Sequence, residues 1–341
     1  MKNIFIPCVV DKDNTNAQNL TVKEILKRLD TSKYRIFVFC EKTVEDELKS
    51  KKNIRFIPWR KRNNALRFLA YVLFYGIDIL FYPRYTRLEM FLISIRRFMK
   101  FKIVTHVVHS VDESSFANKN INKLISSSDY VFGNSDFVSN SVEKYFHRPC
   151  KTIWNGINFN FFYPPLSEVN KSKRLKILFV GSFQKRKRIQ LVIKAAADNK
   201  NSDFHLVGRY TMDDLRSIYN ENLPENMVLY GQVSQKMLGE IMRKSDIFIF
   251  PSINEGHPQV LGQASACGLP IIAMDIIKPD YVKHGFNGFL AKTDEQFFSY
   301  IKTFINNPES IKTMSKNAIQ KSKNFDWDKA SEEWKFFFRI S

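Results

Sequence analysis

The protein has 341 residues, enough for about two domains that each bury a core. Apolar residues make up 44% of the chain and charged residues 26%, an ordinary globular composition that excludes a disordered or fibrous protein. The charge is unusual, because 53 lysines and arginines against 34 acids give a formal net charge of +19. A negatively charged partner is therefore expected: a nucleic acid, a membrane surface or a phosphorylated substrate.

The cysteines and the apolar runs exclude several further classes. The four cysteines lie far apart and form no CxxC pair, which excludes a zinc ribbon and argues against a disulfide framework. We therefore expect reduced thiols in the cytoplasm. The first apolar run, 3–10, is short and has no small-residue cleavage site, so it predicts a β-strand rather than a signal peptide. The longest apolar stretch, 68–82, falls short of the ~20 residues that cross a bilayer.

In the first half, apolar runs of strand length alternate with amphipathic stretches. The expected strands are 3–10, 34–40, 53–59, 77–83, 101–109, 129–134 and 151–154. Apolar positions recur at helical spacing within 15–30, which predicts a crossover helix between the first two strands. This alternation predicts parallel strands with helices on both faces of a sheet.

A second series of the same kind follows an interruption. Pro164, Pro165 and a polar, basic stretch predict a linker over 161–174. The strands expected after it are 175–181, 203–208, 226–230, 246–250 and 270–275. Both halves are thus predicted to be doubly wound α/β domains, whose ligands bind outside the carboxyl ends of the strands, and the expected site is a cleft between them.

Three common nucleotide and hydrolase motifs are missing from the sequence. No GxGxxG follows the first strand, and neither GxxxxGK[ST] nor GxSxG occurs. This argues against nicotinamide-dinucleotide binding, P-loop hydrolysis and α/β-hydrolase chemistry.

A glycine and a run of cations follow the first strand of the second half. Gly181 ends the apolar run 175–181, and four consecutive cations, 185–188, precede the next helical pattern. Glycine permits close approach of a ligand to the backbone, and a helix N-terminus favours anions. The segment is therefore predicted to bind phosphate; the alternative is a charged turn that only faces solvent.

An acid lies in the turn that follows strand 246–250. Glu255 directly precedes Gly256 and the start of another helical pattern. At the carboxyl end of a strand in a doubly wound sheet, such an acid faces the ligand crevice. The alternative role for Glu255 is an acid that complements the dipole of the following helix.

Taken in order, these segments resemble the retaining glycosyltransferases of family four (glycosyl transferases group 1), which have the two-domain GT-B fold. The resemblance rests on segments 155–158 (NGIN), 181–188 (GSFQKRKR), 251–258 (PSINEGHP), 263–273 (QASACGLPIIA), 285–288 (GFNG) and 325–327 (FDW). It covers nearly the whole chain. The implied domains are an acceptor-side domain 1–160, the linker 161–174, a nucleotide-sugar domain 175–325 and a C-terminal helix 326–341 that packs on the first domain.

The chain departs from the family pattern at three points. Gln263 stands where the family has the second of two paired glutamates, so it can bond a ribose hydroxyl pair only without charge assistance. Ser182 stands where an arginine often follows the first glycine, so Arg186 or Arg188 must assist Lys187. The Gly-Gly loop usual after the first strand is replaced by the polar segment 13–19.

The resemblance also implies roles for individual residues. Lys187 would neutralise the diphosphate, Glu255 would hold hydroxyls of the donor sugar, and Gln263 would hold the ribose. His109, at the end of strand 101–109, matches a family histidine near the reacting centre, and His106 on the opposite face of that strand is its competitor. The implied donor-binding residues are Gly181, Ser182, Arg186, Gly256, His257, Pro258, Gln259, Val260 and Gln263, and the implied acceptor-side loop contains Asn14, Thr15 and Asn16.

No metal and no cofactor are expected. Many transferases neutralise the departing diphosphate with a metal held by an Asp-x-Asp motif, and Asp11-Lys12-Asp13 fits that pattern. This triplet, however, lies in the acceptor-side loop. Fixed cations and the backbone N–H groups around 258–260 can stabilise the same charge.

Most of the basic excess lies in residues 49–102. This segment holds fourteen Lys or Arg and two acids, and it is rich in aromatic residues. Cations mixed with aromatic and aliphatic residues suit an anionic membrane surface, which fits a lipid-linked acceptor. The alternative is that the aromatic residues are core and the charges merely solvated. Nucleic acid is not expected as a partner, because the chain has no recognised nucleic-acid motif.

The sequence thus predicts a retaining, metal-independent hexosyltransferase that uses a nucleotide-diphosphate sugar and a glycan acceptor in bacterial surface polysaccharide or lipopolysaccharide synthesis. We expect it in the cytoplasm, peripheral on the inner face of the plasma membrane. Two alternatives remain open. One is a weakly active or inactive protein of the same fold that binds an anionic membrane or nucleic acid, and the other is a nucleotide-sugar epimerase.

Overall fold

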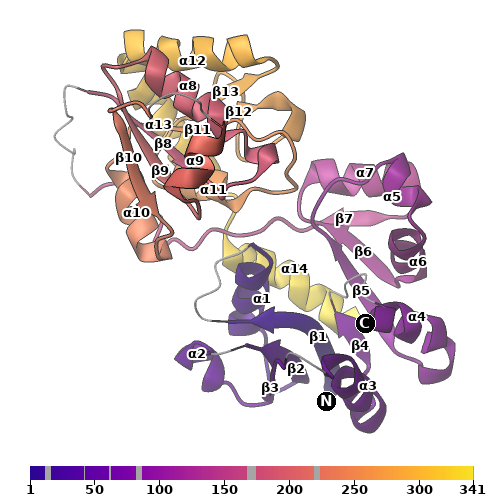
Figure 1. The fold of residues 1–341 in the computed structure, drawn as a ribbon. Helices are drawn as coiled ribbons and strands as arrows, with labels where there is room; N and C mark the ends of the chain where they lie inside the picture. The colour runs from indigo at the N-terminus through magenta and orange to yellow at the C-terminus, as the bar shows by residue number, and fades with distance from the viewer. Residues whose placement is uncertain are drawn as a thin grey trace. The chain divides into compact units, whose positions relative to one another are not determined.

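The computed structural model describes residues 1–11, 17–41, 43–60, 63–81, 87–166, 174–218 and 223–340. Contacts divide the chain into two compact units, residues 1–155 with 327–341 and residues 156–326 (Figure 1). The second unit begins at Gly156, ahead of the expected linker at 161–174, because Ile157 and Phe162 are buried in its core.

The first unit contains a parallel sheet flanked by helices. Its strands are β1 (Lys2–Val10), β2 (Tyr34–Cys40), β3 (Ile54–Pro58), β4 (Ile79–Phe81), β5 (Lys102–Val107), β6 (Tyr130–Gly133) and β7 (Cys150–Thr152). Its helices are α1 (Ala17–Arg28), α2 (Asp46–Lys49), α3 (Asn64–Tyr75), α4 (Arg87–Met99), α5 (Glu113–Ala117), α6 (Lys119–Ser127), α7 (Asp136–Phe146) and α14 (Trp327–Ile340). Among the described residues the strand order is β3-β2-β1-β4-β5-β6-β7.

Both faces of this sheet are buried, as expected for parallel strands. Successive side chains of β1 point to opposite faces. Ile4 and Ile6 join the core formed with α1 and α14, whereas Phe5 joins the core formed with α3 and α4. The continuous apolar run at the start of the chain is therefore a central strand covered on both sides.

The C-terminal helix α14 is part of the first unit. Trp334 is buried there, with its ring centroid 4.2 Å from that of Phe132 and 5.3 Å from that of Phe81. At the start of the helix, Asp328 pairs with Arg28 of α1 at 2.7 Å. The last residues of the chain thus complete the core that the first 155 begin.

The second unit contains another parallel sheet. Its strands are β8 (Lys176–Val180), β9 (Asp203–Val207), β10 (Met227–Gly231), β11 (Ile247–Phe250), β12 (Ile271–Met274) and β13 (Gly288–Ala291). Its helices are α8 (Ile189–Asp198), α9 (Met212–Ile218), α10 (Gln235–Arg243), α11 (Gln259–Ala266), α12 (Asp294–Asn306) and α13 (Glu309–Ser322), with 3₁₀ turns at Lys185–Lys187 and Asp275–Ile277. In the part of the unit that the structure describes, the order is β10-β9-β8-β11-β12-β13. The edge strand β13 was not predicted.

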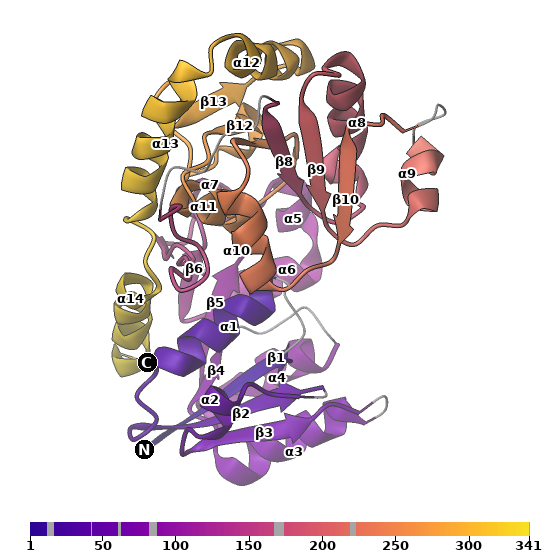
Figure 2. The same cartoon turned by 90° about the vertical axis from the view of Figure 1, so that its left-hand side faces the viewer.

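Helices cover this second sheet on both faces (Figure 2). Leu178 of β8 packs in the core with α10 and α11, and its neighbours Ile177 and Phe179 pack in the core with α8 and α12. The strand order reverses direction between β8 and β11, which are adjacent and parallel. Ligands of doubly wound sheets bind at such a reversal, outside the carboxyl ends of the strands.

The two sheets confirm the predicted doubly wound α/β class. Across the described ranges, no helix combines the length and the apolar character needed to cross a membrane.

Candidate active site in the second unit

The loops that follow β8 and β11 meet at the reversal of strand order. The backbone N–H of Ile253 donates to the carbonyl of Arg186 at 3.1 Å, and Ser252 Oγ lies 3.1 Å from the same carbonyl oxygen. Two segments about seventy residues apart in sequence are thus joined at the backbone. The predicted phosphate segment and the predicted acid therefore form one site.

The centre of this site is a cluster of two cations and a carboxylate. Lys187 Nζ lies 2.6 Å from Glu255 Oε1, and the Arg186 guanidinium pairs with the same oxygen. The Ser252 hydroxyl donates to it at 2.6 Å. Arg186 also donates to the Asn254 carbonyl at 2.9 Å. One carboxylate oxygen therefore orients both cations that the resemblance implies for the diphosphate.

Lys187 is an unusual lysine because it is buried. Its ammonium lies 4.7 Å from the centroid of the Phe250 ring, on the last residue of β11. Burial lowers the pKa of Lys187; the nearby carboxylate of Glu255 opposes that shift and the charge of Arg186 adds to it. A buried ammonium needs an anionic partner to stay charged. A phosphate group bound beside Lys187 would be such a partner and would form a strong charge-assisted hydrogen bond.

Arg188, the other arginine predicted to assist Lys187, forms an ion pair outside the cluster. Its backbone lies in the left-handed region, with φ of 52°, and its guanidinium pairs with Asp294 at the start of α12. Of the two arginines proposed to assist Lys187, the structure brings only Arg186 to Glu255.

Helix α11 begins directly beyond the Glu255 loop. Gly256, His257 and Pro258 are buried, and Pro258 precedes the first helical residue, Gln259. The amide dipoles at a helix N-terminus favour anions, so this end of α11 suits a phosphate group. Val260 and Gln263 are half-buried on the same helix.

His257 anchors this loop rather than facing solvent. Its Nδ1 lies 3.0 Å from the Tyr281 hydroxyl, and the two rings are 4.3 Å apart at their centroids. Asp280 Oδ2 lies 3.9 Å from its Nε2. The His257 side chain is fully buried, and these contacts hold it at the residues that precede α11.

Gly181 and Ser182 follow β8, as predicted, and both are half-buried. The Gly181 backbone packs tightly against the end of β9. A Cβ on Gly208 would lie 1.7 Å from the Gly181 carbonyl oxygen, so only glycine fits at that position. This contact holds the strand ends close together next to the cation segment.

The two candidate histidines of the first unit have different environments. His106 is buried on β5, its ring 4.8 Å from that of Phe132 and 5.4 Å from that of Trp334. Burial lowers the pKa of His106 to about 3. His109 lies beyond the end of β5 and is exposed. His106 is therefore a core residue, and His109 is the one of the pair that a substrate can reach.

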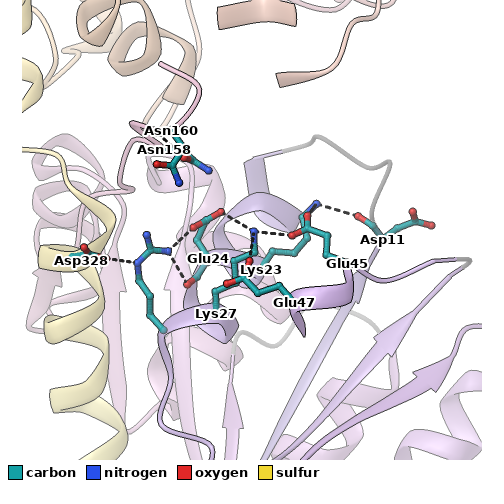
Figure 3. A network of polar contacts seen from close by, with 10 residues as sticks. Asp11, Lys23, Glu24, Lys27, Glu45, Glu47, Asn158, Asn160 and Asp328 are labelled. Atoms are coloured by element: carbon teal, nitrogen blue, oxygen red, sulfur yellow. Dashed lines mark hydrogen bonds and ion pairs between the residues drawn. The ribbon is translucent and has the colours of Figure 1, made fainter. Parts of the chain in front are cut away.

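The predicted acceptor-side residues Asn14, Thr15 and Asn16 lie outside the described residues. The chain before and after them is held by a polar network (Figure 3). Lys23 of α1 donates to the Asp11 carbonyl at 3.2 Å and pairs with Glu45 at 3.0 Å. Within the described ranges, no group of three or more His, Cys, Asp or Glu side chains could hold a metal ion.

Sequence reasoning missed several residues that shape the site. Ser252 lies in segment 251–258 without a predicted role, and no role was predicted for Tyr281, Asp280 or Gly208. The Pro-Ser pair directly after β11 was the only local signal for Ser252. The other contacts join segments distant in sequence, so no local pattern could predict them.

The fold of the chain is that of the GT-B glycosyltransferases. The structure of Anabaena Alr3699/HepE in complex with UDP-glucose superposes with a TM-score of 0.80, at 16% identity and over 100% of both chains. The model of the family described as glycosyl transferases group 1 matches residues 166–321.

Curated relatives point to the same family. "Uncharacterized glycosyltransferase MJ1069" of Methanocaldococcus jannaschii is 30% identical over 278 residues, 73% of this chain and 70% of that protein. The chain therefore belongs to the glycosyl transferases group 1 family. "Uncharacterized glycosyltransferase MJ1178" of the same organism is 28% identical over 206 residues, 59% of this chain, and the alignment spans 57% of its length.

A further relative carries a specific name. "UDP-Gal:alpha-D-GlcNAc-diphosphoundecaprenol alpha-1,3-galactosyltransferase" of Escherichia coli is 32% identical over 122 residues, 33% of this chain and 30% of that protein.

Proposed function

We propose that the protein is a retaining glycosyltransferase that moves a hexose from a nucleotide-diphosphate sugar to a glycan acceptor. The observation that carries this proposal is the cluster of Arg186, Lys187 and Glu255, next to the N-terminus of α11 at the reversal of strand order. Membership of the glycosyl transferases group 1 family supports it. Retention of anomeric configuration rests on the resemblance to family four.

The chemistry requires positive charge at one place. Transfer breaks the bond between the anomeric carbon and a diphosphate oxygen, so negative charge develops on the departing diphosphate. Lys187, Arg186 and the N-terminal amides of α11 would stabilise that charge without a metal or another cofactor. Removing one preorganised donor of this kind typically lowers the rate by ~10²–10³.

Glu255 would contact both the donor sugar and the cations that bind the diphosphate. Its Oε1 accepts hydrogen bonds from Lys187 and Ser252. Its second oxygen, Oε2, can accept hydrogen bonds from hydroxyls of the donor sugar. One carboxylate would then fix the sugar relative to the cations that receive the leaving group, and Gln263 would contact the ribose.

UDP-sugars are the first donors to test. The descriptions of the HepE complex and of the Escherichia coli relative both contain UDP. The second description also names a diphosphoundecaprenol acceptor, which supports a lipid-linked acceptor for this chain. We place the activity in bacterial surface polysaccharide or lipopolysaccharide synthesis, with the protein peripheral on the inner face of the plasma membrane. His109 and the loop 14–16 would lie on the acceptor side.

The decisive experiment compares two lysine variants of the same turn. Lys187→Ala should lower the release of nucleoside diphosphate by ~10²–10³, because it removes the buried ammonium. Lys185→Ala, two residues earlier and exposed, should keep the rate within about threefold of wild type. Thermal melting of both variants checks that they are folded. Wild-type turnover in folded Lys187→Ala would refute the proposal.

The same assay separates the alternatives. EDTA should leave the wild-type rate unchanged, and an NMR time course should show a product with retained configuration. Absence of nucleotide release from any UDP-, GDP- or ADP-sugar would favour an inactive binding protein. Conversion of the donor without any acceptor would favour an epimerase.

A further inference from the structure

Two neighbouring helices of the first unit expose large apolar side chains to solvent. On α3, Leu66, Leu73 and Phe74 are 66%, 56% and 85% exposed. On α4, Phe91 and Phe98 are 50% and 73% exposed. Single exposed apolar residues are common, but a group of five on adjoining elements marks an interaction surface.

These side chains form one stripe on each helix. Leu66, Leu73 and Phe74 are related by steps of seven and eight residues, and Phe91 and Phe98 by seven, so each set lies on one helix face. The opposite faces are buried in a single core, through Phe68 and Val72 of α3 and through Leu92 and Ile93 of α4. Both helices therefore cover the same side of the sheet (Figure 1) and direct their second apolar stripe away from it.

The surroundings of this outer face are basic. Exposed cations in the described parts of the chain that flank these helices are Arg60, which precedes α3, and Lys100, which follows α4. The guanidinium of Arg55, also exposed, lies 5.5 Å from the centroids of the Tyr71 and Tyr75 rings of α3.

The segment 49–102 has two acids against fourteen Lys or Arg, so its net charge is strongly positive. Glu89 is buried, and the Asp78 carboxylate accepts a hydrogen bond at 2.7 Å from the backbone N–H of Asn3, near the start of the central strand β1.

We propose that the outer face of α3 and α4 docks on an anionic membrane, with Leu66, Leu73, Phe74, Phe91 and Phe98 entering the interface and the surrounding cations contacting lipid phosphates. An apolar stripe rimmed by Lys and Arg is the pattern of elements that lie in the membrane interface. A second copy of the chain fits this face poorly, because the two positive surfaces would repel each other. Single-stranded nucleic acid is less favoured than a membrane, because the sequence has no recognised nucleic-acid motif.

This inference deepens the membrane location that is part of the proposed function. Since none of its residues belongs to the site in the second unit, vesicle binding and glycosyl transfer can fail separately. The vesicles are equimolar phosphatidylglycerol and phosphatidylethanolamine, with phosphatidylcholine vesicles for comparison, at 50 mM and 500 mM NaCl. We expect sedimentation with the anionic vesicles only, and a fraction that stays bound at high salt because the apolar side chains are inserted.

The test variant is Leu73→Gln/Phe74→Gln, which keeps helix-compatible side chains. It should bind the anionic vesicles at least ~10-fold more weakly, whereas Met237→Gln/Ile276→Gln, at two exposed apolar positions of the second unit, should bind as wild type. UDP binding should be the same in all three proteins. Unchanged vesicle binding by Leu73→Gln/Phe74→Gln would overturn the proposal.

A reporter variant keeps the result interpretable if the double variant fails to fold. The fluorescence of Phe74→Trp should shift to the blue on addition of anionic vesicles and be quenched by brominated lipid. An unshifted emission together with bound protein would show that α3 stays in water, and would overturn the inference. A competition experiment adds single-stranded RNA to the vesicle-bound protein. Displacement of the protein from the vesicles while the emission wavelength of Phe74→Trp stays unchanged would also overturn the inference.

Discussion

The ion cluster at Glu255 yields the sharpest prediction about the site. Glu255→Gln keeps the shape of the side chain and removes its charge. In the structure Oε1 accepts hydrogen bonds from Lys187, Arg186 and Ser252. The substitution therefore turns two charge-assisted bonds between oppositely charged groups into weaker bonds to a neutral amide, and it leaves two cations side by side.

The expected loss follows from the strength of these bonds. A hydrogen bond to a charged group contributes ~1.5–3 kcal/mol and a neutral one ~0.5–1.5 kcal/mol, so each converted bond loses about 1 kcal/mol. The Lys187 bond is buried and keeps its full value, whereas the Arg186 side chain is 33% exposed and its bond is partly screened. We expect a total loss of about 1–2 kcal/mol, which lowers Tm by ~2–8 °C for a unit of this size.

Differential scanning calorimetry measures this loss, with Glu309→Gln as the matched control. Glu309 also pairs with a lysine, Lys312 at 3.1 Å, but both side chains are more than half exposed. The control should lose less than about 1 kcal/mol, because exposed ion pairs contribute little. Pyrophosphate should then raise the Tm of Glu255→Gln more than that of wild type, because the anion replaces the missing charge.

Two results would refute this reasoning. If the Tm of Glu255→Gln equals that of Glu309→Gln, the stability of the cluster does not depend on the carboxylate charge. If pyrophosphate raises the Tm of Glu255→Gln no more than that of wild type, Lys187 and Arg186 are not a diphosphate site.

Two further predictions concern the first unit. His106 is neutral when folded because its pKa is lowered to about 3, and the unfolded chain binds the proton below pH 6.5, so stability is lost as pH falls from 6.5 toward 3. Urea unfolding at pH 7 and pH 5 should show a loss of ~2 kcal/mol in wild type that is missing in His106→Phe; an equal loss in both would contradict this. Trp334→Ala should destabilise the unit by ~3–5 kcal/mol in the same assay, whereas Phe336→Ala, exposed on the same helix, should cost less than ~1 kcal/mol. Equal effects of these two would show that α14 is not anchored through Trp334.

The central strands were predictable because their signal is local. The apolar run 34–40 is β2 to the residue, and 203–208 is β9 to within one residue. Each run is continuously apolar because parallel strands are covered on both faces. The edge strand β13 escaped prediction because its four residues, Gly288–Ala291, are too short to show a period and follow a glycine-rich turn.

The site was predictable in its residues but not in its pairing. Lys187 and Glu255 each carry a local signal, a glycine followed by cations and an acid in a turn after a strand. Which arginine joins them was left open between Arg186 and Arg188. The left-handed backbone at Arg188 and the nearby Asp294 turn that side chain toward α12, and both features depend on contacts across the sheet.

By itself, the sequence determined the parallel α/β class, the positions of most of the strands, and the segments that meet at the candidate site, because apolar periodicity and turn residues are properties of neighbours in the chain. Tertiary structure alone decided that His106 is buried against Trp334, that Glu255 gathers two cations on one oxygen, and that α3 and α4 keep an apolar stripe in solvent. Burial and ion pairing depend on which distant segments come together. A local pattern does not contain that information.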